Sequence, residues 1–292
     1  MKILVTGGNG QVGFELRRQL CLLGKVLAPS RQELDLSDVD EVDQWLKAHQ
    51  PELIVNAAAY TAVDKAEDDR TLARRLNAEL PAQLAEYSAE QGKWLVHYSS
   101  DYVYPGSGKA PWQEDDSTCP LSVYGQTKLE GDEVVQQSNC QHLIFRTSWV
   151  YGARGHNFMK TMLRLGRDRD SLRVVSDQVG APTPARLIAQ VTALALTAPK
   201  KPSCGIYHLA PRGETSWLGF AQEIFRQASA MGEELTIRPE RVAEISTIEY
   251  PTPAVRPLNS RLCCRKLEEA LSITLPSWQN QLTLTLSEYL DR

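Results

Sequence analysis

The sequence predicts an α/β protein built on a doubly wound parallel sheet, with a smaller lobe toward the C-terminus. Short runs of apolar and β-branched residues alternate with helix-length segments, which is typical of a parallel sheet. The runs are apolar along their whole length, as expected where helices cover both faces of the sheet. The 292 residues suffice for one large domain with a smaller lobe, or for two modest domains.

The first strand is expected at residues 3–6, and an amphipathic helix follows it. Gly24 is expected to close this helix. Its apolar face is formed by Val12, Leu16, Leu20 and Leu23. Further strands are expected at residues 53–57, 94–99 and 143–147, where β-branched and apolar residues cluster.

The sequence changes character after about Tyr151, where we expect a second lobe to begin. The distinctive segments are a basic helical stretch at 157–167, a turn-rich segment at 180–184 and a proline-rich segment at 251–254. Residues 181–215, which include a strand-like run at 205–209, are expected to return to the first sheet. The same is expected of the helix after Ser216.

Composition excludes several classes of function. Hydrophobic residues make up 42% of the chain and charged residues 23%, and the net charge of -4 is spread along the sequence, which indicates a globular protein without nucleic-acid partners. No signal peptide or membrane-spanning run is evident. The six cysteines and five histidines lack metal-ligand spacing, so we expect no metal centre and reduced thiols in the cytoplasm.

A glycine-rich loop joins the first strand to the first helix. Glycines there allow a tight turn and the close approach of a pyrophosphate, while the helix N-terminus offers free N–H groups. The loop residues expected to contact a dinucleotide are Gly7, Gly10, Gln11, Val12 and Gly13. This context predicts a Rossmann-type sheet, with residues 1–150 as the dinucleotide-binding domain and residues 151–292 mainly as a substrate-binding lobe.

The spacing of the loop glycines resembles that of the short-chain dehydrogenase/reductase superfamily, especially its extended branch. Asp35-Leu36-Ser37-Asp38 resembles the acidic motif of that superfamily whose first aspartate meets the adenine. Asp35 and Asp38 can equally be helix-capping residues. Other cofactor contacts are expected at the carboxyl ends of strands; these residues are Ala57, Ala58, Ala59, Tyr60, Thr61 and Tyr98.

Arg31 predicts the choice of cofactor. It stands at the end of the second strand, where a cofactor with a bare 2′-hydroxyl usually meets an acidic residue. We therefore expect NADPH to be preferred, with NADH as the alternative. A solvated surface arginine is the competing interpretation.

Tyr124 and Lys128 are the expected catalytic pair, because a four-residue spacing puts them on one face of a helix. A nearby ammonium should lower the pKa of the tyrosine from its usual value of about 10. Ser100, after the strand at 94–99, is expected to hold a substrate carbonyl. Together the three residues resemble the Ser/Thr, Tyr, Lys triad of the superfamily, in which tyrosine supplies the proton that accompanies hydride transfer.

Segments 98–106, 145–151 and 251–262 closely resemble dTDP-4-dehydrorhamnose reductases, and the resemblance spans nearly the whole chain. It implies reduction of the 4-keto group of a dTDP-6-deoxy-hexulose to give dTDP-L-rhamnose for surface polysaccharide, including lipopolysaccharide. Ser100 departs from the threonine that this family often carries, but either hydroxyl serves. The residues expected to bind the nucleotide-sugar are Ser100, Asp101, Tyr102, Trp149 and Arg256.

Three other functions stay open. A nucleotide-sugar 4,6-dehydratase normally has a glutamate base where this chain has Tyr102. A 4-epimerase would retain its cofactor through a full cycle. A non-catalytic NADP-binding regulatory subunit resembles the same reductases. A homodimer is a further expectation, and the sequence leaves open whether magnesium acts at an interface or on the diphosphate.

Overall fold

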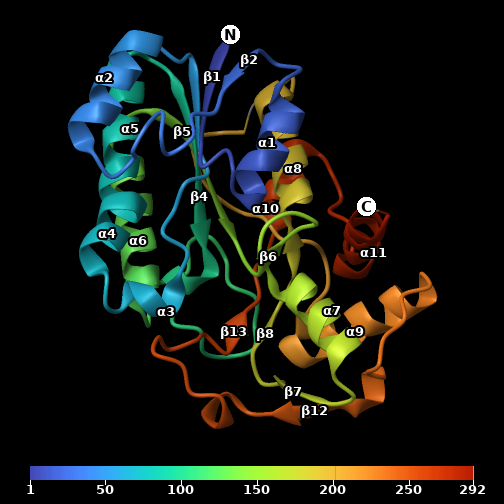
Figure 1. Ribbon diagram of the computed structural model, residues 1–292. Coiled ribbons are helices and arrows are strands. Elements are labelled where there is room, and N and C mark those ends of the chain that lie inside the picture. Colours follow the sequence, from blue (N-terminus) through green and yellow to red (C-terminus); the bar gives the residue numbers. More distant parts are fainter. Residues whose placement is uncertain (201, 292) are drawn as a thin grey trace.

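The computed structural model describes residues 1–200 and 202–291 (Figure 1). Its centre is a six-stranded sheet in the order β10-β5-β4-β3-β1-β2, and every neighbouring pair in it is parallel. The strands are β1 (Lys2–Thr6), β2 (Lys25–Leu27), β3 (Leu53–Asn56), β4 (Trp94–Ser100), β5 (Gln141–Thr147) and β10 (Gly205–His208). The predicted α/β fold class is therefore confirmed.

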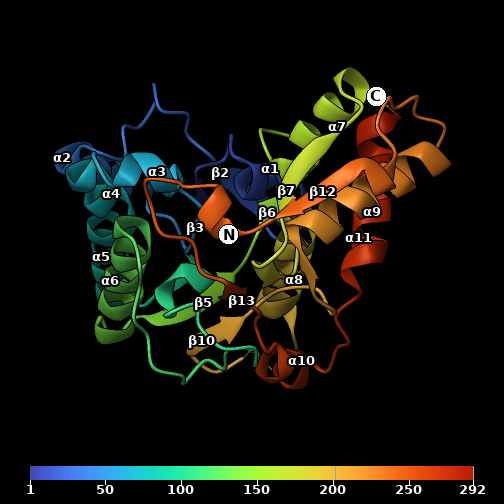
Figure 2. The same ribbon diagram turned by 90° about the horizontal axis from the view of Figure 1, so that it is seen from below.

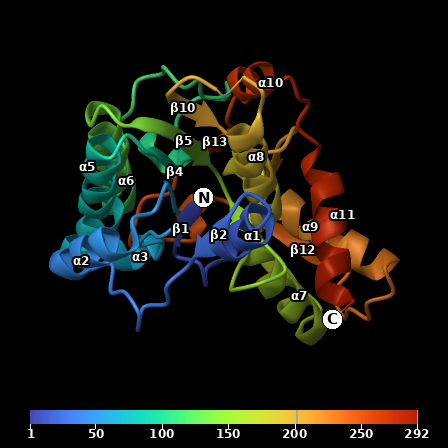
Figure 3. The same cartoon turned by 90° about the horizontal axis from the view of Figure 1, so that it is seen from above.

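Helices cover both faces of this sheet (Figure 3). Helices α1 (Gln11–Leu20) and α8 (Ala185–Thr197) pack on one face. Helices α2 (Val39–His49), α5 (Leu80–Glu90) and α6 (Val123–Gln137) pack on the other, and the short α3 (Val63–Ala66) and α4 (Arg70–Arg74) precede α5. Buried aliphatic side chains fill both interfaces, which explains the continuously apolar strands.

The first helix ends earlier than the sequence predicts. Helix α1 stops at Leu20, and the N–H of Leu23 donates back to the carbonyl of Leu20 at 2.9 Å. Residues 21–23 therefore form a turn, so that Gly24 follows the turn and not the helix. Leu23 still packs against the core that α1 covers.

The second lobe has a core of its own (Figure 2). It is built from α7 (Phe158–Asp168), α9 (Trp217–Ala230) and α11 (Trp278–Leu290), with the parallel pair β7 (Leu172–Val175) and β12 (Val242–Ile245). The expectation that the helix after Ser216 returns to the first sheet is wrong. This helix is α9, and its buried Phe220, Ile224 and Phe225 pack in the second core.

Short strands connect the lobes. β6 (Val150–Tyr151) pairs with β9 (Thr183–Pro184), and β8 (Val179–Gly180) lies between β11 (Thr215–Ser216) and β13 (Asn259–Ser260). Helix α10 (Arg265–Leu271) packs near β10. None of the helices within residues 1–200 and 202–291 is long and apolar enough to cross a membrane.

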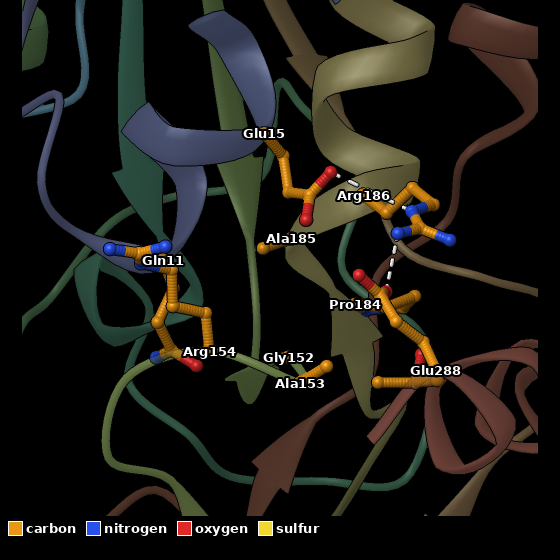
Figure 4. A pocket seen from close by; sticks show the side chains of 10 residues that line it. Gln11, Glu15, Gly152, Ala153, Arg154, Pro184, Ala185, Arg186 and Glu288 are labelled. Carbon is orange, nitrogen blue, oxygen red and sulfur yellow. Dashed lines mark hydrogen bonds and ion pairs between the residues drawn. The ribbon is translucent and has the colours of Figure 1, made fainter. Parts of the chain in front are cut away.

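An ion-pair cluster joins the C-terminal helix to the first domain (Figure 4). The guanidinium of Arg186 on α8 pairs with Glu288 on α11 and lies 3.6 Å from a carboxylate oxygen of Glu15 on α1. Arg18 contacts the same two carboxylates, at 3.5 and 3.4 Å. The cluster fixes α11 beside the helix that begins at the glycine loop.

Candidate active site

A cleft of about 900 Å3 runs along the carboxyl ends of the central strands and reaches the second lobe. This is the edge at which doubly wound sheets bind ligands. The predicted residues that line it are Gly7, Gly10, Gln11, Val12, Arg31, Asp35, Leu36, Ala57, Ala58, Ala59, Thr61, Tyr98, Ser100, Asp101, Tyr102, Tyr124, Lys128 and Trp149. Gly13, Tyr60 and Arg256 do not line it.

The glycine loop crosses the end of the sheet at one end of the cleft. Gly7 has a φ of +64°, and a Cβ there would lie 2.8 Å from the backbone nitrogen of Ala58. A Cβ on Gly13 would lie 2.1 Å from the carbonyl oxygen of Gly7. Both positions therefore require glycine, and Gly13 shapes the loop from behind. The N-terminus of α1 begins directly after Gly10, so its free N–H groups lie at this end of the cleft.

Arg31 lies at the mouth of the cleft. Its side chain is 79% exposed and forms an ion pair with Asp35 at 3.7 Å. Two hydrogen bonds from Ser37 lower the pKa of the Asp35 carboxyl, so that Asp35 stays ionised. Because most of its side chain is exposed, the Arg31 guanidinium can also bind an anionic group of a ligand.

Tyr60 lies outside the cleft, unlike the prediction, and is only partly buried. Its backbone exchanges hydrogen bonds with the Asn77 side chain at 2.8 and 3.2 Å, and its ring packs beside Ala66, Ala73 and Val123. Tyr60 therefore supports the wall of the cleft from outside. The strand pattern that ends at β3 does not predict this position, because residues 57–62 are no longer a strand.

Ser100, Tyr124 and Lys128 all line the cleft. Ser122 caps the N-terminus of α6 by accepting a hydrogen bond from the Gly125 N–H. The helix therefore begins just before Tyr124, and it carries Tyr124 and Lys128 on the face toward β4. Ser100 ends β4, and its side chain interacts with the Tyr124 hydroxyl. The sequence prediction that these three residues come together agrees with this geometry.

The electrostatics of Tyr124 differ from the prediction. Burial raises the pKa of Tyr124, and the interaction with Ser100 only partly opposes this rise. Burial, and not the charge of Lys128, therefore sets the direction of this shift. The Lys128 ammonium donates to the Tyr98 carbonyl at 2.6 Å. Burial also lowers the pKa of Lys128 to about 8, against the attraction of Asp132.

Two buried oxygen atoms beside Ser100 lack partners. Asp101 Oδ1 accepts from the Ser100 hydroxyl at 3.0 Å, but Asp101 Oδ2 has no hydrogen-bond partner within the described residues. Burial raises the pKa of Asp101 to about 6. Thr147, which pairs with Ser100 in the sheet register, likewise has an unpaired hydroxyl. The Ser260 and Ser100 side chains only partly oppose this rise of the Asp101 pKa.

Trp149 lies at the second-lobe end of the cleft. It has a φ of 49°, and its ring stacks on Trp217 with centroids 3.7 Å apart. Trp217 also lines the cleft. The sequence did not single out Trp217, since it belongs to α9 and reaches the cleft only because the second core places α9 there.

Arg256 stands behind the cleft wall. It forms an ion pair with Asp64 at 2.7 Å and lies 3.4 Å from the hydroxyl of Tyr102, which does line the cleft. The edge of the Tyr102 ring meets the Tyr124 ring at a centroid distance of 5.4 Å. Burial raises the pKa of Tyr102 to about 12.

Within residues 1–200 and 202–291, no group of three or more His, Cys, Asp or Glu side chains could hold a metal ion. Glu15 and Glu288, which face one another across the small pocket of Figure 4, have Arg186 between them. The Arg186 guanidinium therefore supplies the positive charge between these two carboxylates.

The fold and the cleft together define a dinucleotide-binding α/β protein of the short-chain dehydrogenase/reductase type. The family model described as "RmlD substrate binding domain" matches residues 1–291. The chain therefore belongs to the dTDP-4-dehydrorhamnose reductase family, as its sequence predicted.

Individual relatives agree with this assignment. A dTDP-4-dehydrorhamnose reductase of Shigella flexneri is 45% identical over 99% of this chain and 98% of its own length. One from Burkholderia thailandensis is 43% identical over the full length of both chains. The crystal structure of the reductase from Clostridium acetobutylicum has a TM-score of 0.92 with 38% identity, covering all of both chains. That from Bacillus anthracis, in complex with NADP, has a TM-score of 0.89 with 32% identity, covering 98% of this chain and 99% of the other.

Proposed function

We propose that this chain reduces the C4 ketone of a dTDP-linked 6-deoxy-hexulose with NADPH, converting dTDP-4-dehydro-L-rhamnose into dTDP-L-rhamnose for surface polysaccharide. The observation that carries the proposal is the cleft itself, which joins a glycine loop at one end to Trp149 at the other through Ser100, Tyr124 and Lys128. The names of the relatives support the same substrate and cofactor.

The residues at the glycine loop fit a dinucleotide. Side chains at Gly7 and Gly13 would fill the space in which the loop turns, and the N-terminus of α1 offers free N–H groups to a pyrophosphate. Arg31 at the cleft mouth suits a 2′-phosphate. Bound there, NADPH supplies the hydride.

Ser100 is the residue that holds the substrate carbonyl in this proposal, and Tyr124 is the one that protonates its oxygen. Tyr124 is protonated at neutral pH, because burial raises its pKa above the ordinary value of about 10. The Lys128 ammonium then stabilises the phenolate that is left behind. Asp101 and Thr147 line the cleft next to Ser100 and form part of the proposed sugar site.

Trp149 and Arg256 complete the substrate site in this account. The exposed face of the Trp149–Trp217 stack packs against the sugar or the base. Arg256 contributes indirectly, because it lies 3.4 Å from the Tyr102 hydroxyl and supports the wall that Tyr102 forms.

Dehydration and epimerisation have weaker support. Tyr102 occupies the place where a dehydratase has its glutamate base, and a hydroxyl with a pKa of about 12 removes no proton at neutral pH.

We also propose that the protein acts in the cytoplasm, which the six free cysteines support. A homodimer stays a prediction, and light scattering tests it.

The proposal is tested by incubating the purified protein with NADPH and a panel of nucleotide-linked 4-keto sugars while the absorbance of reduced cofactor is followed. We expect oxidation with the dTDP-linked 6-deoxy-4-ketose above all other sugars. No oxidation with any of them would return the regulatory-subunit function to first place.

Replacing Arg31 with alanine should reduce the preference for NADPH. We expect the KM for NADPH to rise roughly tenfold, because the variant loses one exposed charge-assisted contact with the cofactor. The KM for NADH should barely change. Steady-state kinetics with both cofactors measure this, with Arg265→Ala as a control for an exposed arginine far from the cleft. Equal changes in both KM values would show that Arg31 does not meet the 2′-phosphate.

Replacing Trp149 with alanine should weaken substrate binding while NADPH binding is kept. An aromatic anchor in a buried site contributes on the order of 2 kcal/mol, so we expect the substrate KM to rise roughly 30-fold. Fluorescence titration with NADPH and kinetics with the ketose separate the two effects. A fall in NADPH affinity of the same size would make Trp149 a structural residue.

A further inference from the structure

The loop that leads into the second lobe lies against the first turn of α1. Residues 152–157 connect β6 with α7, and Gly155 of this loop lines the cleft together with Gln11 on α1. Arg154 borders the small pocket beside Gln11 (Figure 4), and its guanidinium lies 4.1 Å from the centroid of the Phe14 ring. The 152–157 loop therefore joins the second lobe to the helix that begins at the glycine loop.

Gly155 allows the 152–157 loop to pass close to the Gln11 side chain. It has a φ of +77°, and a Cβ there would lie 2.8 Å from Gln11 Cγ. Any other residue at this position would therefore push the loop away from α1. The Lys160 ammonium on α7 donates to the Gly155 carbonyl at 2.7 Å and holds the turn from the other side.

The hydrogen bonds of the Asn157 side chain fix the orientation of its amide. Asn157 Oδ1 accepts from the backbone N–H of Lys160 at 3.2 Å. Asn157 Nδ2 donates to the Gly152 carbonyl at 2.7 Å and to Gln11 Oε1 at 2.8 Å. Because a backbone N–H only donates and a carbonyl only accepts, the amide of Asn157 can face only this way. Both of its N–H groups are used, and one of them holds Gln11.

Asn157 thus has two roles that can be separated. Its oxygen caps the N-terminus of α7, and its nitrogen ties α7 to the first residue of α1. A dinucleotide held at the glycine loop restrains that first turn of α1. The hydrogen bond between Asn157 and Gln11 transmits this restraint to α7. The ion pairs of Glu15 and Arg18 lie further along α1 and hold α8 and α11, not α7.

We propose that Asn157 is a positioning residue that couples the cofactor loop to the second lobe: its amide ties Gln11 to the start of α7, so that a dinucleotide bound at the glycine loop also steadies α7. Because such coupling is reciprocal, a substrate that steadies the second lobe tightens the binding of the dinucleotide. Only this substrate half rests on the proposed function. Asn157 itself is not one of the residues that line the cleft.

Hydrogen exchange measured by mass spectrometry tests the coupling with NADPH as the only ligand. No residue of α7 lines the cleft, so slower exchange in this helix does not come from direct contact with the cofactor. One neutral hydrogen bond corresponds to about a fivefold change in an equilibrium constant, so we expect NADPH to slow the exchange of the α7 amides roughly fivefold. Unchanged exchange in the unmodified protein would overturn the proposal.

Asn157→Ser separates the tie to Gln11 from the helix cap. A serine hydroxyl still accepts from the Lys160 N–H, but it is too short to reach Gln11. We therefore expect NADPH to slow the exchange of α7 less than twofold in this variant. If Asn157 only capped the helix, exchange would rise by the same factor with and without NADPH and the fivefold slowing would remain, which would contradict the proposal.

Gln11→Met removes the same hydrogen bond from its other end and leaves the cap of α7 intact. It should abolish the slowing as Asn157→Ser does, and the double variant should bind NADPH no more weakly than the weaker of the two single variants. Independent losses that add in the double variant would contradict the proposal.

Lys160→Met is the matched control, because it removes a different hydrogen bond of the same loop, the one to Gly155. The tie between Asn157 and Gln11 stays in place, so the fivefold slowing of α7 exchange should be kept. Loss of the slowing in this variant as well would assign the effect to the loop as a whole and overturn the role of Asn157.

These measurements separate the inference from the proposed function. They use NADPH alone, so a protein that reduces no 4-keto sugar still gives a result. If Asn157→Ser does not fold, Gln11→Met still decides. In an active protein, Asn157→Ser should raise the KM for the ketose roughly fivefold while kcat changes less than twofold, because Asn157 touches none of the reacting groups. A fall in kcat with an unchanged KM would contradict the proposal.

Discussion

Replacing Tyr124 with phenylalanine should lower kcat by roughly 10²- to 10⁴-fold, the loss typical of a removed general acid, with NADPH binding nearly intact. Hydride that arrives at the ketone carbon leaves negative charge on the oxygen, and the Tyr124 hydroxyl is the proposed proton donor beside Ser100. Phenylalanine keeps the ring, which packs against Tyr102. Single-turnover kinetics and fluorescence titration measure the two quantities.

Tyr102→Phe gives the matched comparison, because it removes the neighbouring hydroxyl in the same cleft. We expect this variant to raise the substrate KM while kcat changes only a few-fold. If Tyr124→Phe kept wild-type turnover and Tyr102→Phe lost it, the proton donor would have been assigned to the wrong tyrosine.

Replacing Lys128 with methionine should cost more than the Tyr124 change. It removes the charge that stabilises the phenolate, and in the superfamily that this chain resembles, the lysine also bonds the nicotinamide ribose. We expect kcat to fall by roughly 10³-fold or more and NADPH affinity by about tenfold. Kinetics and NADPH titration measure these losses.

Thermal unfolding shows whether the Lys128→Met variant stays folded, a necessary control because Lys128 is buried. The side chain is only 1% exposed, so the variant changes the core as well as the charge. Methionine has a similar length, and we expect the variant to stay folded with the Tyr98 carbonyl left unpaired. Unchanged NADPH affinity in a folded variant would remove Lys128 from the cofactor site.

The expected pH dependence of turnover follows from the pKa of Lys128. Turnover needs Lys128 charged, and its pKa lies at about 8 in the structure. We therefore expect kcat to be maximal below that pH and to decline as the pH rises through it. A rate that increases steadily up to pH 10 would contradict this dependence on a protonated lysine.

Much of the fold could be predicted because its signals are local. The apolar runs from Ile3 to Thr147 and the glycine loop each occupy a short stretch of chain, and their order alone defines a parallel sheet. Tyr124 and Lys128 were found for the same reason, since one helix turn separates them. These residues needed no knowledge of distant contacts.

What the sequence missed depends on distant contacts. Trp217 reaches the cleft because α9 packs in the second core, and the pattern around Ser216 did not reveal which core α9 would join. The pKa of Tyr124 was predicted to fall, but burial by the surrounding protein raises it. The contact of Asn157 with Gln11 likewise depends on where the second lobe lies against α1.

The central claim is that hydride passes from NADPH to the C4 ketone of the sugar, and isotopic transfer tests it most directly. Each of the two stereospecifically 4-deuterated forms of NADPH is incubated with the protein and the dTDP-linked 6-deoxy-4-ketose, and the product is analysed by mass spectrometry and proton NMR. We predict that one of the two forms places a single deuterium on C4, with one NADPH oxidised for each product formed. Product without deuterium, deuterium at another carbon, or conversion without net NADPH oxidation would contradict the account.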